Sequence, residues 1–348
     1  MRDFKEHLIK VNETLGTALN MLNNIAPDGV LFVVNEDNCL VGSLTDGDIR
    51  RGFINGKTTA TSLIEFVELN PKVIYKPKFS LNDIIALREQ EYKIVPVLND
   101  QERVVNVLNF RSQKSYLPMD AIIMAGGLGS RLKPMTDNTP KPLLRVGNKP
   151  IIDHNIDRLI SFGIDDFHIS VRYLGEQIES HITDRELHGV NFNFVWEKDA
   201  LGTLGGATLI EEFKHEHILI TNSDVLTTLN YEDFFLDFIR NDADMSVVTI
   251  PYKVEVPYAV VDTEERFVTG FKEKPTYEYY CNGGIYLVKK QLLNLIPKGQ
   301  FYNATDLMQY VIAKSMKLVS FPIRDYWLDV GKPEDFSKAN EDIKFLKL

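Results

Sequence analysis

From Met119 onward, short apolar segments alternate with segments whose apolar residues recur at helical spacing. The apolar segments are AIIMA (121–125), DFHISV (166–171), NFNFVWE (191–197), EHILITNSD (216–224), ADMSVVTIP (243–251), YAVVD (258–262) and GGIYLV (283–288). The helical segments are IIDHNIDRLISFG (151–163) and GEQIESHI (175–182). This alternation predicts an α/β fold with a mostly parallel sheet. Ligands of such sheets bind beyond the carboxyl ends of the strands, so residues directly after strands are the first candidates for a site.

The first 115 residues instead contain a weak internal repeat, over residues 29–52 and 93–114. Each copy has an apolar strand, a turn with Asn or Asp and a second strand, and a helical pattern precedes each copy. Leu40 and Val104 occupy matching points 64 positions apart. The repeat, together with GSLTDGDIRR, resembles a tandem pair of CBS domains. A polar segment with Pro118, residues 112–120, reads as a linker, so we expect domains at 1–115 and 119–348.

Composition limits the classes of function. The net charge of −10 disfavours nucleic acid as a partner, because such binders neutralise phosphates with basic residues. No apolar run reaches the ~18 residues of a membrane span, and the charged N-terminus does not resemble a signal peptide. We therefore expect a cytoplasmic protein with no membrane partner. Cys39 and Cys281 fit no disulfide or zinc pattern, and we expect both to be buried.

A glycine-rich loop follows the strand at 121–125. Gly126, Gly127 and Gly129 leave backbone N–H groups open to an anion, and Arg131 and Lys141 add cations. The loop is neither GxxxxGK[ST] nor GxGxxG, which argues against an NAD-type oxidoreductase. Taken alone, the glycines fit a simple tight turn with two surface cations better than a phosphate-binding loop.

The longer stretch GGLGSRLKPMTDNTPKPLLRVGNKPII, residues 126–152, resembles the signature of sugar-1-phosphate nucleotidyltransferases. The likeness continues to about residue 335. It implies a Rossmann-like catalytic domain in which Ala125, the three glycines and Ser130 bind a nucleoside triphosphate. It also implies that Arg131 neutralises the departing pyrophosphate and that Lys141 binds near the α-phosphate.

Two aspartates are candidates for metal binding. Asp224 ends the apolar strand of ILITNSDVL, and Asp329 lies in YWLDVG. Carboxylates at strand ends suit Mg²⁺, although an aspartate in such a place also caps turns. The family resemblance implies that Asp224 and Asp329 share one Mg²⁺, which requires the fold to bring them together.

The sugar phosphate has its own candidate segment, FKEKP at 271–275. The resemblance implies that Lys274 holds the phosphate of a sugar 1-phosphate and Glu273 accepts hydrogen bonds from sugar hydroxyls, although a charged hairpin end would look the same. Asn282 and Gly283 of CNGGIYLV are expected near the sugar. Ala259 of PYAVVD replaces the glycine that many relatives carry there, which puts the identity of the sugar in doubt.

The segment WEKDALGTLGGA, residues 196–207, resembles the base-recognition segment of the family, with Glu197, Gly202 and Thr203 near the nucleotide. A carboxylate only accepts hydrogen bonds, and guanine offers N1–H and N2–H₂ on one edge. Glu197 therefore favours GTP, unless it is only a solvated loop residue.

We therefore expect an enzyme that joins GTP and a hexose, hexosamine or heptose 1-phosphate into an NDP-sugar for surface glycans, with release of pyrophosphate. One alternative is a choline-phosphate cytidylyltransferase, whose aromatic cage would use Tyr277, Tyr279 and Tyr280. Another is a non-catalytic sensor of sugar nucleotides.

The N-terminal pair has a candidate ligand site of its own. Resemblance to CBS pairs implies that Thr45 and Asp48 hold the ribose of an adenine nucleotide, while the same residues also fit a helix cap. CBS pairs also assemble readily, so we expect a homodimer or a higher homo-oligomer.

Overall fold

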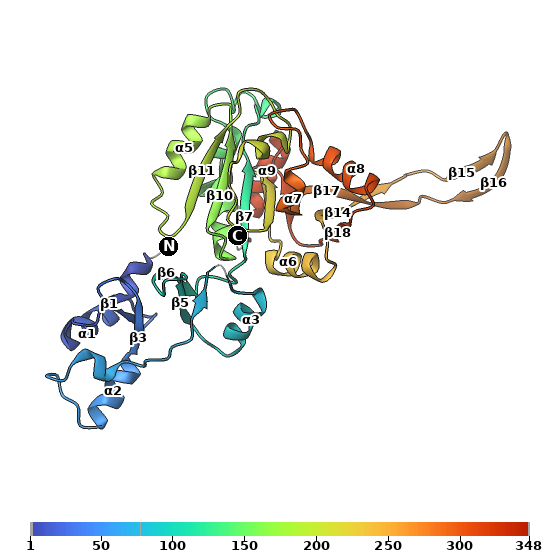
Figure 1. Cartoon of the computed structure of the whole chain (residues 1–348). Coiled ribbons are helices and arrows are strands. Elements are labelled where there is room, and N and C mark those ends of the chain that lie inside the picture. Colours follow the sequence, from blue (N-terminus) through green and yellow to red (C-terminus); the bar gives the residue numbers. More distant parts are fainter. Residues whose placement is uncertain (1–2, 77, 347–348) are drawn as a thin grey trace. The chain divides into compact units, whose positions relative to one another are not determined.

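The computed structural model describes residues 3–76 and 78–346. They form two compact units (Figure 1). The first contains the chain up to Pro118 with Leu159–Asp166 and Thr183–Asn191, and the second contains Met119–Arg158, Phe167–Ile182 and the chain from Phe192 on. The domain limits expected from the sequence, 1–115 and 119–348, stay a prediction.

The N-terminal unit holds two sheets of the same design. Each has a parallel and an antiparallel pair, with strands β1 (Leu8–Lys10), β2 (Val30–Val34), β3 (Leu40–Thr45) and strands β4 (Ile74–Tyr75), β5 (Ile94–Leu98), β6 (Val104–Asn109). Its helices are α1 (Leu15–Asn24), α2 (Asp46–Ile54) and α3 (Leu81–Glu89). α1 and α3 occupy the same place in their copies, between the two parallel strands.

Backbone pairing confirms the repeat predicted from the sequence. The register shifts between Val33 and Val34 in one copy and between Val97 and Leu98 in the other, again 64 positions apart. The two copies also bond to each other, because the N–H of Leu40 donates to Glu102 and that of Val104 to Asn38, at 3.0 and 3.1 Å. Phe32 and Val34 of the first copy share an apolar cluster with four buried residues of the second, Ile94, Leu98, Val104 and Val107.

The second unit is built on a seven-stranded sheet of order β11-β10-β7-β12-β17-β14-β18. Its strands are β7 (Met119–Met124), β10 (Asp166–Val171), β11 (Asn191–Trp196), β12 (His217–Asn222), β14 (Met245–Glu255), β17 (Thr276–Lys289) and β18 (Leu318–Pro322). β7 runs parallel to β10 and β12, whereas β17 is antiparallel to both of its neighbours. The mainly parallel α/β fold is therefore as predicted.

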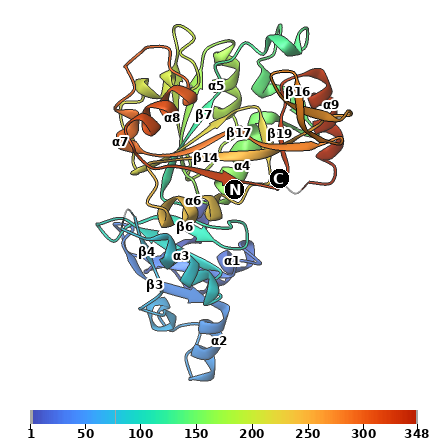
Figure 2. The same cartoon turned by 90° about the vertical axis from the view of Figure 1, so that its right-hand side faces the viewer.

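Helices cover both faces of this sheet. They are α4 (Ile151–Ser161), α5 (Gly175–Thr183), α6 (Tyr231–Arg240), α7 (Lys290–Leu293), α8 (Ala304–Ala313) and α9 (Pro333–Asp342). α8 and α9 lie on opposite sides of the unit (Figure 2). All six residues of β10 are buried, as expected for a strand covered on both faces. α7 and α8 pack on β7, β12, β14 and β17 through Leu292, Leu293, Ala304 and Leu307.

Three short strand pairs complete the unit: β8 (Arg145–Val146) with β9 (Lys149–Pro150), β13 (Val225–Thr227) with β19 (Trp327–Asp329), and β15 (Val260–Glu264) with β16 (Phe267–Lys272). The segment YAVVD, expected as one of the strands of the main alternation, belongs to the β15–β16 hairpin instead. This hairpin extends a ribbon made by the outer halves of β14 and β17, which projects from the sheet (Figure 1). We call residues 251–281 the arm.

The expectation of two buried cysteines is wrong. Cys281 is exposed on the arm and Cys39 is half-buried at a turn. The ribbon in which Cys281 lies has no cover within the described chain, and nothing in the local sequence signals that. Among residues 3–76 and 78–346, no helix is long and apolar enough to cross a membrane.

Candidate active site

The glycine loop begins where β7 ends. Ala125 is buried and its N–H donates to Ser170 of β10 at 2.8 Å, which fixes the start of the loop. Gly129 has φ 62°, and a Cβ there would lie 3.0 Å from side-chain atoms of Lys141 and Thr136. A side chain at Gly127 would meet nothing within 4 Å. Gly129 therefore serves the turn, while Gly127 leaves backbone open toward solvent or a ligand.

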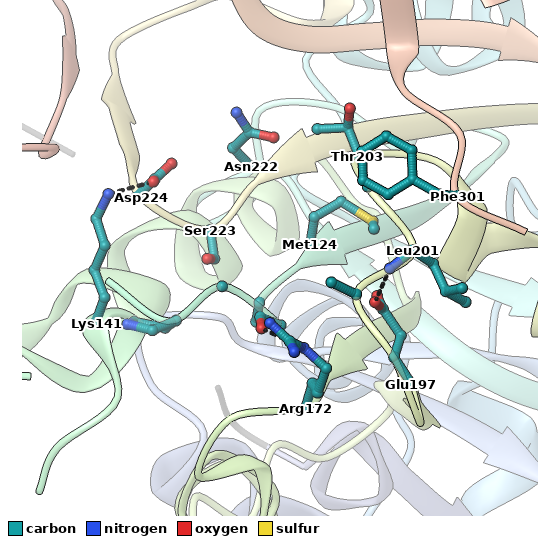
Figure 3. Close-up of a pocket in the computed structure, with 16 residues that line it drawn as sticks. Met124, Lys141, Arg172, Glu197, Leu201, Thr203, Asn222, Ser223, Asp224 and Phe301 are labelled. Atoms are coloured by element: carbon teal, nitrogen blue, oxygen red, sulfur yellow. Dashed lines mark hydrogen bonds and ion pairs between the residues drawn. The ribbon is translucent and has the colours of Figure 1, made fainter. Parts of the chain in front are cut away.

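A cavity of about 330 Å³ opens beside this loop (Figure 3). It lies at the carboxyl ends of β7, β10 and β12, where an open α/β sheet binds its ligands. The residues that line it are Met124, Ala125, Gly126, Gly127, Lys141, Pro142, Arg172, Glu197, Ala200, Leu201, Gly202, Thr203, Asn222, Ser223, Asp224 and Phe301. Eight of these sixteen were candidates from the sequence: Ala125, Gly126, Gly127, Lys141, Glu197, Gly202, Thr203 and Asp224.

Lys141 connects the two candidate metal ligands. Its ammonium donates to Asp224 and lies 3.8 Å from Asp329 Oδ1. β13 and β19 bring these carboxylates together, since Val225 pairs with Asp329 and the N–H of Val330 donates to the backbone oxygen of Asp224 at 3.0 Å. Two aspartates 105 positions apart in the sequence therefore lie beside one buried cation.

The electrostatics of this pair suit a divalent cation. Burial raises the pKa of Asp329, the charge of Asp224 raises it further, and Lys141 and Arg131 oppose the rise. Asp224 Oδ1 and Asp329 Oδ1 are both buried without a hydrogen-bond partner in the part of the chain that the structure describes. Hard carboxylate oxygens in this state are the ligands that Mg²⁺ prefers, so the residues present fit that ion.

Glu197 lines the cavity and also holds its own loop in place. Ser170 donates to one carboxylate oxygen and the N–H of Leu201 to the other, the latter at 3.2 Å (Figure 3). The side chain is buried, and a Cβ at Gly206 would lie 2.6 Å from Oε1. Each oxygen keeps a second lone pair, so Glu197 can still accept from a ligand.

Gly202 and Thr203 contact the residues at the start of α8 and so stabilise the cavity wall. Gly202 has φ 76°, and a Cβ there would lie 2.8 Å from the backbone oxygen of Tyr302. The hydroxyl of Thr203 donates to Asn303 Oδ1 at 3.3 Å and accepts from the N–H of Ala304 at 3.0 Å. Both residues thus tie the wall of the cavity to the start of α8.

The remaining predicted residues lie outside the cavity wall. Ser130 is exposed at the start of a 3₁₀ turn, and Arg131 is exposed beside Gly331 and Asp329. Ala259, Glu273 and Lys274 are exposed on the arm.

Asn282 and Gly283 lie at the base of the arm, close to the cavity. The indole N–H of Trp327 donates to Gly283 at 2.8 Å. A Cβ at the next residue, Gly284, would lie 2.7 Å from the amide nitrogen of Asn222, which lines the cavity. The structure therefore places the base of the arm near the site and its outer part elsewhere.

Sequence reasoning missed several cavity residues. Arg172 directly follows β10 and its Nε donates to Gly126 at 3.3 Å, so the carboxyl-end rule could have found it. Asn222 ends β12 and Ser223 directly follows it, so the same argument could have found both. Phe301 comes from a loop far along the chain, and no motif signals it.

A second group that could bind a metal ion lies away from this cavity. Asp120, Asp166 and His215 are buried, and one ligand atom from each lies within 4.8 Å of the others. Asp120 is the second residue of β7 and Asp166 the first of β10, so the group sits at the amino ends of these strands. Asp120 Oδ2 also accepts the N–H of His215 at 2.8 Å, which gives the carboxylate a structural task.

In the N-terminal unit, Thr45 and Asp48 form a helix cap. The N–H of Thr45 donates to Asp48 Oδ2 at 2.8 Å, and that of Asp48 donates to Thr45 Oγ1 at 3.2 Å, at the start of α2. Thr45 also lines a cavity of about 480 Å³ whose charged lining residues are Asp28, Glu68, Lys72, Glu91, Lys93 and Arg111. The cap role is present, and the ligand role stays a prediction.

Comparison with known proteins identifies the family of the chain. Residues 120–344 match the family model described as nucleotidyl transferase, and residues 3–55 match that of the CBS domain. The chain belongs to the nucleotidyl transferase family. This nucleotidyl transferase therefore carries an N-terminal CBS domain, and the second CBS domain expected from the sequence stays a prediction.

Its curated relatives act on sugar 1-phosphates, by their names. A D-glycero-alpha-D-manno-heptose 1-phosphate guanylyltransferase of Aneurinibacillus thermoaerophilus is 31% identical over 65% of this chain and 99% of its own. A mannose-1-phosphate guanyltransferase of Yarrowia lipolytica is 33% identical over 63% of this chain, which spans 62% of that protein. The crystal structure of HddC from Yersinia pseudotuberculosis, 24% identical, shares the fold with a TM-score of 0.52 over 64% of this chain and 99% of that one.

Proposed function

We propose that this nucleotidyl transferase joins a nucleoside triphosphate and a sugar 1-phosphate into an NDP-sugar and releases pyrophosphate. The observation that carries the proposal is the buried Lys141 between Asp224 and Asp329, beside an open glycine loop. The names of the relatives support the substrate class, and two of them, 31% and 33% identical, are guanylyltransferases.

The reaction needs positioning and charge neutralisation, and no protein nucleophile. A phosphate oxygen of the sugar 1-phosphate attacks the α-phosphorus in line, and the bond from that phosphorus to the oxygen of the leaving pyrophosphate breaks. Backbone N–H groups at Gly126 and Gly127 would bind the triphosphate. Lys141 would stabilise the extra charge at the α-phosphate, and Arg131 the charge on pyrophosphate.

Mg²⁺ held by Asp224 and Asp329 would neutralise phosphate charge and help align the two substrates. The orphaned buried oxygens of both residues support this assignment. Lys141 would then exchange part of its contact with Asp224 for a contact with the α-phosphate, because ammonium and metal compete for the same carboxylate oxygens.

We further propose GTP as the nucleotide. Glu197 is a buried acceptor at the cavity wall, and guanine presents two donors on one edge. The guanylyltransferase names of the relatives point the same way.

The rival reading as a choline-phosphate cytidylyltransferase has weak support. Tyr277, Tyr279 and Tyr280 all lie in β17, where successive side chains point to opposite faces. Tyr280 therefore faces away from the other two, and the three cannot enclose one quaternary ammonium.

A pyrophosphate-release assay would test the proposal and identify the substrates. The four common nucleoside triphosphates are crossed with a panel of hexose, hexosamine and heptose 1-phosphates, with Mg²⁺ present. We expect release with GTP and at least one sugar 1-phosphate. Release with CTP and choline phosphate would favour the rival enzyme, and no release with any pair would favour a non-catalytic sensor of sugar nucleotides.

For the CBS pair we propose an adenine nucleotide in the cavity beside Thr45, and a role in homo-oligomer formation. Calorimetric titration with AMP, ATP and S-adenosylmethionine checks the ligand. Heat with one of them supports a regulatory site, and none with any leaves only the assembly role.

A further inference from the structure

Two opposite charges lie at one end of the cavity beside the glycine loop. Arg172 directly follows β10 and Glu197 directly follows β11, and both line the cavity (Figure 3). The N–H of Glu197 donates to the backbone oxygen of Val171 at 3.0 Å, so the two side chains leave the sheet from neighbouring strands. Within residues 3–76 and 78–346, neither side chain forms an ion pair, with the other or with a third residue. The two charges are therefore available to a ligand.

The guanidinium of Arg172 is fixed at one nitrogen and free at the other two. Its Nε donates to the backbone oxygen of Gly126 at 3.3 Å, which is its one hydrogen bond to the part of the chain that the structure describes. A guanidinium has five N–H donors, so four remain on the two terminal nitrogens. Such a group makes planar contacts with two neighbouring acceptors at once.

Gly126 lies between the two charged groups. A Cβ at Gly126 would lie 3.4 Å from the Cβ of Arg172 and 3.5 Å from Oε1 of Glu197. Because this position carries no side chain, a flat ligand can approach the backbone there. Each carboxylate oxygen of Glu197 accepts one hydrogen bond from the protein and has a lone pair for a second. This end of the cavity therefore offers donors and acceptors side by side.

The candidate metal ligand and Lys141 lie at the other end of the cavity. The strands follow in the order β11-β10-β7-β12, and Asp224 comes just after β12. The strand end before Arg172 is thus next to that before Glu197, and two strands, roughly 10 Å, from that before Asp224. Figure 3 shows Lys141 and Asp224 together, with Glu197 on the far side of the cavity. This placement favours the base over the phosphates as the partner of Arg172.

We propose that Arg172 is a second specificity residue for guanine, donating to O6 and N7 while Glu197 accepts from N1–H and N2–H₂. This inference rests on the proposed function and adds the residue that binds the other edge of the base. Arginine is the commonest specific partner of the two neighbouring acceptors O6 and N7. Adenine would turn its N6–H₂ toward Arg172 and its unprotonated N1 toward Glu197, so both charged groups would lose a partner. The pair thus selects GTP against ATP.

Calorimetric titration with nucleotides that lack single groups tests the proposal. GTP, 7-deaza-GTP with C–H in place of N7, and inosine triphosphate without the N2 amino group are titrated with Mg²⁺ but without a sugar 1-phosphate. The wild type should bind each analogue roughly tenfold or more weakly than GTP, because each lacks a hydrogen bond to a charged group. Arg172→Met keeps the length of the side chain and removes its donors. This variant should bind GTP as weakly as 7-deaza-GTP.

Inosine triphosphate provides the internal control. Its affinity relative to GTP depends on Glu197, so the ratio of the two dissociation constants should be the same in Arg172→Met as in the wild type. An unchanged ratio also shows that the variant keeps its pocket. Arg240→Met, at the exposed end of α6, is the matched control and should bind all three nucleotides like the wild type.

Three results would overturn the proposal. Equal affinity of the wild type for GTP and 7-deaza-GTP shows that N7 has no donor in the cavity, whether or not the variant folds. An Arg172→Met protein that binds every nucleotide more weakly by one factor, and still prefers GTP to 7-deaza-GTP, shows that Arg172 binds phosphate. Tighter binding of ATP or UTP than of GTP by the wild type shows that the cavity does not select guanine.

This test is separate from the test of the proposed function. It measures binding and needs no turnover, so a lack of pyrophosphate release would contradict the enzyme activity and leave the binding result valid. Conversely, pyrophosphate release from GTP with no preference for GTP over 7-deaza-GTP would support the activity and contradict the role of Arg172.

Discussion

At the scale of single residues, Lys141 lies at the centre of the proposed site. Its ammonium is buried, lines the cavity and contacts both candidate metal ligands. A cation in this place can stabilise charge that develops only in the transition state.

Lys141→Ala should lower kcat by roughly 10²–10³-fold, the usual cost of removing one group that stabilises transition-state charge. Lys133→Ala is the matched control, because Lys133 is exposed and pairs with Asp137 at the surface. Steady-state kinetics with thermal unfolding of both variants separate catalysis from folding. Near-normal turnover of a folded Lys141→Ala protein would show that the assignment is wrong.

The pKa of Asp329 predicts the acid side of the pH profile. Burial raises that pKa, with a further rise from Asp224. Because the protonated carboxyl does not bind Mg²⁺, turnover should fall on acidification at a higher pH than the usual Asp pKa of about 3.9. Added Mg²⁺ favours the ionised form and should move this limb to lower pH. If the pH at which turnover falls does not change with the Mg²⁺ concentration, Asp329 is not a metal ligand.

At the scale of secondary-structure elements, the sequence predicted β7, β10 and β12 and the loops at their carboxyl ends. Their apolar runs are short, buried on both faces and followed directly by the polar residues of the site, so local pattern and tertiary role agree. The repeat in the N-terminal unit could also be predicted from the sequence, because the three strands of each copy pair with one another.

The arm could not be read in the same way. The runs at 243–251 and 283–288 look like ordinary buried strands, whereas their continuations, YKVEV at 252–256 and TYEYY at 276–280, interleave charged residues with apolar ones. Whether a strand continues beyond its sheet depends on what covers it, which local sequence does not encode. Phe301 could not be predicted either, because it reaches the cavity wall from a loop far along the chain.

The capping box at the start of α2 gives a stability prediction for the N-terminal unit. Thr45→Ala should lower the free energy of unfolding by about 0.5–2 kcal/mol, since it leaves an N–H of the first helical turn without its acceptor. Thr45→Ser keeps the oxygen and should stay near the wild type. Urea unfolding of both variants checks this, and equal stability of Thr45→Ala and Thr45→Ser would show that the cap contributes little.

At the scale of the whole molecule, the chain combines a nucleotidyl transferase unit with an N-terminal CBS domain and a projecting arm. We propose above all that the cavity at the carboxyl ends of β7 and β12 carries out metal-dependent nucleotidyl transfer. Asp224 matters most to this proposal, because it contacts Lys141 and its buried Oδ1 has no hydrogen-bond partner among the described residues.

The most direct test is the Mg²⁺ dependence of pyrophosphate release in the wild type and in Asp224→Asn, with exposed Asp184→Asn as control. Asparagine keeps the shape of the side chain and removes its charge. We predict that release by the wild type and the control rises with Mg²⁺ and requires the sugar 1-phosphate, and that Asp224→Asn is at least roughly 10²-fold slower at every Mg²⁺ concentration. A folded Asp224→Asn protein with the wild-type rate and the wild-type Mg²⁺ dependence would contradict the account.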